Sequence, residues 1–221
     1  MTRTILIDNI RGIAFILMVI HHIFYFYDVS NNYSTSFSQN PIVDNSGYMA
    51  RTLFIFLAGV SLSLFSSTGK KRAKRSFKIA IHALIISLVS YIYYPDIFVR
   101  FGILHFMAIA TFILSFIVPY PKLTILILLI SILYNPPQVN PIIDTITGAM
   151  AHNNMMDWFP LFPWISLMLC GVVFGQHVDI NDLNFSKSNI LTKIGQNSLE
   201  LYTSHVVLLI VIYNMKNKII V

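Results

Sequence analysis

Long apolar stretches alternate with short polar ones along almost the whole chain. This pattern predicts seven apolar helices, at residues 10–27, 48–67, 77–96, 101–118, 122–134, 159–176 and 197–214. Most of them approach the length of about 20 residues with which a helix crosses a bilayer. The 122–134 range is shorter, and we expect it to be tilted, bent or partly re-entrant. The chain is therefore predicted to be an all-α, polytopic membrane helix bundle with about seven transmembrane helices.

The composition agrees with this class. Hydrophobic residues make up 56% of the chain and charged residues only 11%, with a mean hydropathy of +0.69, whereas soluble domains carry about 25% charged residues. No repeat or linker is evident, so residues 1–221 are interpreted as one domain. The single cysteine, Cys170, excludes an intramolecular disulfide. Membrane lipids are the expected surroundings and no nucleic-acid partner is expected; a homo-oligomer is compatible with the sequence.

The distribution of basic residues predicts the orientation. Six of the 15 Lys and Arg residues lie in 70-KKRAKRSFK-78, and the positive-inside rule places this loop in the cytoplasm. Seven spans then give a cytoplasmic N-terminus and put segments 28–47 and 135–158 outside. The first apolar range has no small-residue cleavage site after it, so it is interpreted as a retained span and not as a signal peptide. The sequence does not identify the specific membrane.

Four histidines lie within or near the apolar ranges, where ionisable side chains tend to mark function. At about 1.5 Å per helical residue, His22 lies about 16 Å from Arg11, toward the outer face. His105 lies about 7 Å inward from Arg100, so His22 and His105 are expected to share one level. His205 is placed nearer the midplane.

The remaining histidines are harder to assign from the pattern. His82, nearer the cytoplasm, is most simply structural. His21 and His22 point about 100° apart on a helix, and their spacing does not decide which of them faces the core.

The cytoplasmic end carries a different kind of chemistry. Asp8 and Arg11 are spaced i, i+3 and are expected to pair on one helical face. The basic 70–78 segment has two interpretations. It can serve as an orientation signal that contacts anionic headgroups, or, together with Arg11, it can hold the phosphates of an anionic cosubstrate.

The opening run 8-DNIRGIAFILMVIHH-22 resembles the start of the heparan-alpha-glucosaminide N-acetyltransferase family of membrane acyltransferases, and more distantly that of acyltransferase-3. Both share an Arg-Gly pair with a histidine eleven residues after the arginine. In this register His22 takes the histidine position, whereas His21 falls where the family often has an aromatic residue. The resemblance therefore favours His22 over its neighbour.

Further segments resemble the family in the same order. They are 54-FIFLAGVSLSL-64, 101-FGILHFMAIA-110, 160-PLFPWISLMLCGVVFG-175 and 194-IGQNSLELYTSHVVLL-209. Each motif is weak alone, but five in order form a strong signal. The chain lacks the large lumenal region of the animal lysosomal enzyme and has fewer spans, so it is similar to the compact bacterial type.

The resemblance implies transfer of an acyl group, expected to be acetyl, from cytoplasmic acetyl-CoA to an amino-sugar or other carbohydrate acceptor at the opposite face. It implies His22 and His105 as catalytic residues, and no metal. The expected donor-binding residues are Arg11, Lys70, Lys71 and Arg72, and the expected acceptor-binding residues are Asn154, Asp157 and His205. Any partner that orients His22 must come from another helix, with His105, Asn154 and Asp157 as candidates. A covalent acyl-histidine and direct transfer both remain open.

Two other function classes are compatible with a multi-pass helix bundle. In a multi-pass transporter, the histidines would line a pathway or relay protons, but the basic segment would then serve topology alone. In a heptahelical receptor, the N-terminus would face outward, opposite to the predicted orientation. Binding or turnover of acyl-CoA by purified protein separates the acyltransferase from the transporter.

Overall fold

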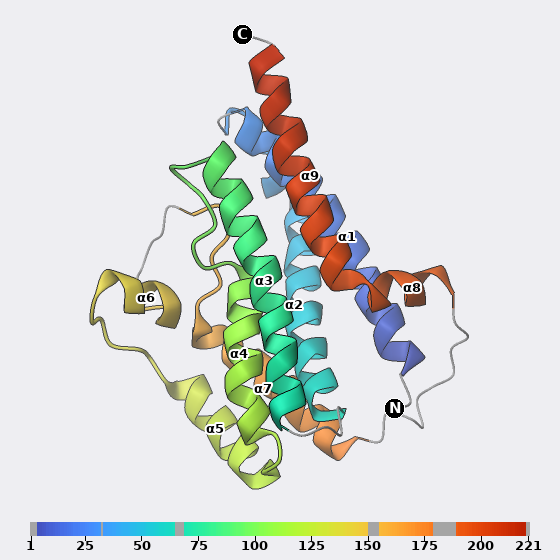
Figure 1. Ribbon diagram of the computed structural model, residues 1–221, viewed down its shortest axis with the longest axis vertical. Coiled ribbons are helices and arrows are strands. Elements are labelled where there is room, and N and C mark those ends of the chain that lie inside the picture. Colours follow the sequence, from blue (N-terminus) through green and yellow to red (C-terminus); the bar gives the residue numbers. More distant parts are fainter. Residues whose placement is uncertain (1–3, 32, 65–68, 150–154, 179–188, 220–221) are drawn as a thin grey trace.

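The computed structural model describes residues 4–31, 33–64, 69–149, 155–178 and 189–219, and these residues are almost entirely helical (Figure 1). The α-helices are α1 (Ile5–Ser30), α2 (Pro41–Leu64), α3 (Gly69–Tyr93), α4 (Ile103–Ile117), α5 (Pro121–Leu133), α6 (Pro141–Thr147), α7 (Leu161–His177), α8 (Ile190–Gln196) and α9 (Ser198–Ile219), with a short 3₁₀ helix η1 (Phe37–Gln39) between the first two. The described part contains no β-strand, only an isolated bridge between Phe101 and Trp158.

Four of these helices, α1, α2, α3 and α9, are long enough and apolar enough to cross a membrane, and α4, α5 and α7 are shorter apolar helices. Together they coincide with the seven apolar ranges expected from the sequence, including the short fifth one. The all-α membrane bundle is thereby confirmed. In Figure 1, α1, α2, α3 and α9 run along the long axis of the molecule, whereas α4, α5 and α7 occupy its lower half.

The basic 70–78 segment is not the loop that hydropathy predicted, because α3 already begins at Gly69. Lys and Arg are good helix formers, and a cluster of positive charge specifies a side of the membrane without specifying a backbone conformation. Segment 135–158 likewise contains α6, and segment 28–47 contains η1 and the start of α2. The predicted spans that correspond to α1, α2 and α3 therefore began too late.

Glycines allow the helices to approach closely. A Cβ atom on Gly59 would collide with the Met168 carbonyl, and one on Gly171 would collide with the Phe56 carbonyl, so α2 and α7 are in backbone contact. This packing is typical of membrane helices, which associate through small residues because lipid offers no hydrophobic driving force between them.

Glycines also position the α8–α9 junction. A Cβ on Gly195 would collide with the Asp8 carbonyl, and one on Gly12 would collide with the Leu191 carbonyl. As a result α8 lies directly against the first turns of α1, and α9 starts beside Arg11.

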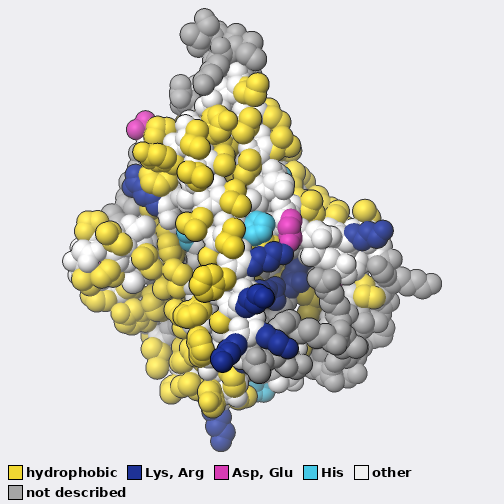
Figure 2. Space-filling view, in the orientation of Figure 1, with side chains coloured by type: hydrophobic (Ala, Val, Ile, Leu, Met, Phe, Trp, Pro, Cys, Tyr) yellow, Lys and Arg dark blue, Asp and Glu magenta, His cyan; other side chains and the backbone are white. Residues whose placement is uncertain are grey.

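Apolar side chains cover much of the outside. Leu84, Leu88, Leu129 and Leu133 are among the exposed large hydrophobic residues. Figure 2 shows broad apolar areas on this face, with a group of basic side chains between them. Such a surface is unfavourable in water and suited to lipid, as expected of a membrane protein.

Candidate functional site

A pocket of about 440 Å³ opens where six helices converge. Its lining comes from the start of α1, the second half of α2, the basic turns of α3, the start of α4 and the α8–α9 junction. The volume is typical of pockets that bind small molecules. The close packing of α8 on α1 explains why α9 begins at this level and contributes its first turn to the pocket.

Arg11 lies in the wall of this pocket, paired as its spacing predicted. Its Nη1 lies 3.2 Å from Asp8 Oδ1, and its Nη2 donates to Ser61 Oγ, which in turn donates to the Leu57 carbonyl at 2.7 Å. The Asp8 side chain is 3% exposed and that of Arg11 15%. A charge this deeply buried needs such partners, so the pair is a fixed part of the wall.

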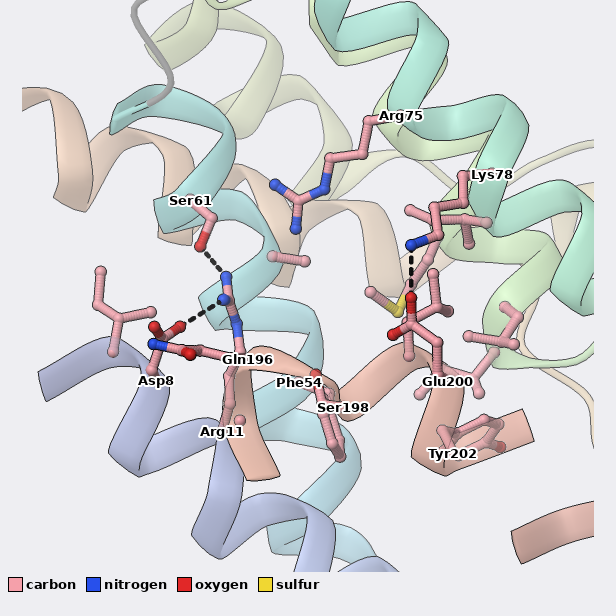
Figure 3. Close-up of a pocket in the computed structure, with 18 of the residues that line it drawn as sticks. Asp8, Arg11, Phe54, Ser61, Arg75, Lys78, Gln196, Ser198, Glu200 and Tyr202 are labelled. Carbon is pink, nitrogen blue, oxygen red and sulfur yellow. Dashed lines mark hydrogen bonds and ion pairs between the residues drawn. The ribbon is translucent and has the colours of Figure 1, made fainter. Parts of the chain in front are cut away.

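Two further cations line the pocket from α3, namely Arg75 and Lys78. Figure 3 shows Arg75 projecting into the space between Arg11 and Lys78, and Lys78 meeting Glu200 of α9. The pocket therefore joins three cationic side chains from two helices with a largely apolar interior. This combination suits a ligand with an anionic end and a long, weakly polar remainder.

The other basic residues singled out in the sequence lie elsewhere. Lys70 and Lys71 are exposed in the first turn of α3 and do not line the pocket. Arg72 is buried, and its Nε donates to the Ser115 carbonyl of α4 at 3.3 Å. Of the four residues expected to bind the donor, the structure places only Arg11 in the pocket.

Beyond the pocket, His22 of α1 meets His205 of α9. The distance from His22 Nδ1 to His205 Nε2 is 2.8 Å, and the two rings are nearly parallel. The expected partners of His22 were His105, Asn154 and Asp157. The structure instead gives it His205, because α8 and α9 pack along α1.

Hydrogen bonding determines the tautomer of this pair. His205 Nδ1 lies 3.0 Å from the Leu201 carbonyl, which can only accept, so His205 carries its proton on Nδ1. In the neutral ring Nε2 is then an acceptor, and His22 must donate to it from Nδ1. The Nε2 atom of His22 is left without a proton, and it has no hydrogen-bond partner in the described residues. His22 as a whole is partly exposed, and no described residue uses the lone pair on its Nε2.

Tyr202 connects the pocket to the histidine pair. It lines the pocket, and its ring centroid lies 5.8 Å from that of His22 and 5.3 Å from that of His205. One residue of the pocket lining is therefore in ring contact with both histidines of the pair.

His21 points to a different neighbour. Its Nδ1 lies 3.2 Å from the Val43 carbonyl of α2, and its ring stacks on Tyr25. A Cβ on Gly47 would collide with this ring, so His21 fills the space left by the glycine. The two adjacent histidines thus face α2 and α9 respectively.

Both ring nitrogens of His105 are engaged locally. Gly102 N–H donates to His105 Nδ1 at 3.2 Å, at the start of α4. Nε2 lies 3.1 Å from Ser87 Oγ, which donates its own proton to the Val99 carbonyl at 2.6 Å, so Nε2 donates to Ser87. No contact between His105 and His22 is present among the described residues. His82 is similarly engaged, with Nδ1 2.9 Å from Thr203 Oγ1.

The side chain of Asp157, which precedes α7 in the chain, contacts the start of α4. Its Oδ2 accepts from Ile103 N–H at 3.0 Å. Burial raises the pKa of this carboxyl to about 6, although the Ile103 hydrogen bond and the positive charge of Arg51 oppose the shift. Asn154, the other residue expected to bind the acceptor, lies outside the described residues.

Several pocket residues were not anticipated. Arg75 and Lys78 lie in the same basic segment as the three cations expected there. Helical spacing would not have singled them out, because Lys71, Arg75 and Lys78 are spaced i, i+4 and i+7 and share one face of α3. Glu200 and Tyr202 lie in the closing motif and carry no local signal of their role. No group of three or more His, Cys, Asp or Glu able to hold a metal ion occurs in the described ranges.

Comparison with known proteins assigns the chain to a family. The family described as heparan-alpha-glucosaminide N-acetyltransferase, catalytic, matches residues 3–207. No curated protein and no solved structure matches at a significant level. The match spans the helices that build the pocket and both members of the histidine pair. The chain therefore belongs to the heparan-alpha-glucosaminide N-acetyltransferase catalytic family of membrane transferases.

Proposed function

We propose that the protein transfers an acetyl group from acetyl-CoA to an amine or hydroxyl of a carbohydrate acceptor, with His22 at the reacting centre. The observation that carries the proposal is the unprotonated Nε2 of His22, one aromatic ring away from a pocket with three cations. Family membership supports the reaction class. The acceptor and the direction of transfer across the membrane are part of the proposal.

The pocket residues fit the donor. Arg11, Arg75 and Lys78 would hold its phosphates through charge-assisted hydrogen bonds. The apolar lining from Phe54, Leu104 and Met107 suits the long pantetheine arm. Along α1, Arg11 and His22 are separated by about 16 Å at about 1.5 Å per residue, and an extended arm is of similar length.

His22 would act as the general base. Its Nε2 takes the proton from the acceptor as the acceptor nitrogen or oxygen attacks the thioester carbonyl. The C–S bond then breaks, and the departing thiolate recovers that proton from His22. His205 holds His22 in the required tautomer and spreads the positive charge of the imidazolium toward the Leu201 carbonyl. The same lone pair could attack the thioester directly and form an acyl-histidine.

On the acceptor side we propose a role for Asp157. It lies in segment 135–158, which is predicted to face outside, and its Oδ2 is held at the start of α4 by the Ile103 N–H. A carboxylate there would accept hydrogen bonds from the hydroxyl or amino groups of a sugar. With the N-terminus and α3 start in the cytoplasm, as the basic cluster indicates, the donor enters from inside.

The test is acetyl transfer by detergent-purified protein, using radiolabelled acetyl-CoA and a panel of amino sugars and glycans. We expect labelled product with the wild type, none with His22→Ala, and near-normal yield with His21→Ala, the adjacent control. Arg11→Ala should weaken acetyl-CoA binding. Trapping of labelled protein without acceptor would favour the covalent route. If the wild type neither binds nor turns over acetyl-CoA, the proposal fails and a transporter becomes the leading alternative.

A further inference from the structure

One carboxylate stands where an anionic donor is proposed to bind. Glu200, in the first turn of α9, forms an ion pair with Lys78 of α3 across the pocket (Figure 3). The two residues are 122 positions apart in the chain, so only the approach of α3 to α9 brings them together. A negative charge in this position works against binding of another anion.

The pocket contains a second carboxylate, and the two differ in how firmly they are held. Asp8 is 3% exposed and bonded to the guanidinium of Arg11 inside the helix packing. Removing that bond would leave a charge buried, which is costly. The side chains of Lys78 and Glu200 are 58% and 46% exposed, respectively. An exposed pair contributes little to stability and can exchange its partners for water or for a ligand.

We propose that Glu200 is a resident competitor that sets the anion selectivity of this pocket. Glu200 pairs with Lys78 while the pocket is empty, and an anionic ligand can bind the Lys78 ammonium only by displacing the Glu200 carboxylate. A donor with several phosphates can displace Glu200, because its other phosphates bind Arg11 and Arg75 at the same time. Competition for Lys78 therefore lowers its affinity only slightly. An anion with a single phosphate depends more heavily on Lys78 and is disfavoured. The inference rests on the proposed function, since it assumes that the donor's phosphates lie in this pocket.

Binding measurements on four proteins test this inference. Coenzyme A and inorganic phosphate are titrated at low salt into detergent-purified wild type, Glu200→Gln, Lys78→Gln and the double variant. Glu200→Gln should tighten coenzyme A binding by about 2–5-fold, the range of an exposed ion pair, and tighten phosphate binding by more. In the Lys78→Gln background the second substitution should change coenzyme A affinity much less, because the competition is for Lys78.

A matched control separates local competition from net charge. Asp44→Asn on α2 removes the same single charge from an exposed side chain outside the pocket, and it should leave both affinities unchanged. Unchanged or weaker coenzyme A binding by Glu200→Gln would overturn the inference, and so would an equal gain from Asp44→Asn. Failure of the wild type to bind coenzyme A would instead overturn the proposed function, and this inference with it.

Discussion

His22 and His105 both lie at contacts between helices, but they use their ring nitrogens differently. His22 donates from Nδ1 to His205 and keeps Nε2 unprotonated and without a partner in the described residues. His105 accepts from Gly102 on one nitrogen and donates to Ser87 on the other. The first pair joins α1 to α9 beside the pocket, and the second ties α4 to α3.

The difference shows two ways in which a histidine is hydrogen-bonded in a membrane bundle. Both avoid the cost of an unsatisfied polar group in an apolar setting. His105 does so with both nitrogens, which leaves nothing for a substrate. His22 does so with one nitrogen, and the fixed tautomer of His205 ensures that the other is a lone pair. The comparison yields four predictions, ordered by expected effect.

The largest effect is expected from His22→Ala. Loss of a positioned acid or base typically lowers the rate about 10²–10⁴-fold, so acetyl transfer should fall by that factor while acetyl-CoA binding is retained. Initial rates and ligand binding on the same preparation give the measurement. His21→Ala, whose ring contacts α2, should be mild. The reverse ranking would place the reactive nitrogen on His21.

His205→Ala should have the next largest effect. Without the acceptor on His205, His22 can adopt either tautomer, and we expect a loss on the order of 10–100-fold, the range seen when groups that orient metal-bound histidines are removed. His205→Gln should recover part of the rate, because its amide oxygen can accept from His22. A higher KM for the acceptor with unchanged kcat would argue instead that His205 binds substrate.

His105→Ala should act on stability and not on the chemical step. The substitution leaves the Gly102 N–H and the Ser87 hydroxyl with one partner fewer, and an unsatisfied buried group costs about 1–3 kcal/mol. Thermal unfolding in detergent should show a lower Tm, while kcat per folded molecule stays within a factor of a few. A large drop in kcat at unchanged Tm would support the catalytic role expected from the family resemblance.

The smallest effect concerns pH and Asp157, which shares the start of α4 with His105. Its pKa is raised from 3.8 to about 6, so between these values the folded protein keeps a proton that the unfolded chain has lost. The free energy of unfolding should therefore decrease as pH rises from about 4 to about 6 and level off above that range. Asp157→Asn should flatten this part of the profile. An unchanged profile in the variant would assign the pH dependence to another group.

Much of the architecture was predictable from sequence, because membrane spans are set by local composition. The seven apolar ranges match seven apolar helices, and the Asp8–Arg11 pair followed from i, i+3 spacing. The start of α3 was predicted too late. The basic residues there predict a side of the membrane, but they do not predict that the backbone is already helical. The predicted ranges for α1 and α2 also began too late, because the polar residues before each apolar range already belong to the helix.

The assignment of partners could not be predicted in the same way. The depth of each residue along its helix predicts His105 as the partner of His22. The helical rise per residue gives the depth of a side chain in the membrane, but it does not say which neighbouring helix the side chain faces. The same rule places the observed partner, His205, nearer the midplane. Gly12 and Gly195 bring α8 against α1, and this contact sets the level at which α9 starts.

The sequence by itself determined the membrane class, the helical segments, the family motifs and the preference for His22 over His21. The tertiary structure alone decided that His205 fixes the His22 tautomer, that Arg75 and Lys78 rather than Lys70 and Lys71 face the pocket, and that Glu200 stands opposite Lys78. The physical reason is that hydropathy and helical spacing are local properties. Hydrogen-bond partners and pocket walls instead depend on how helices distant in the chain rotate and pack against one another.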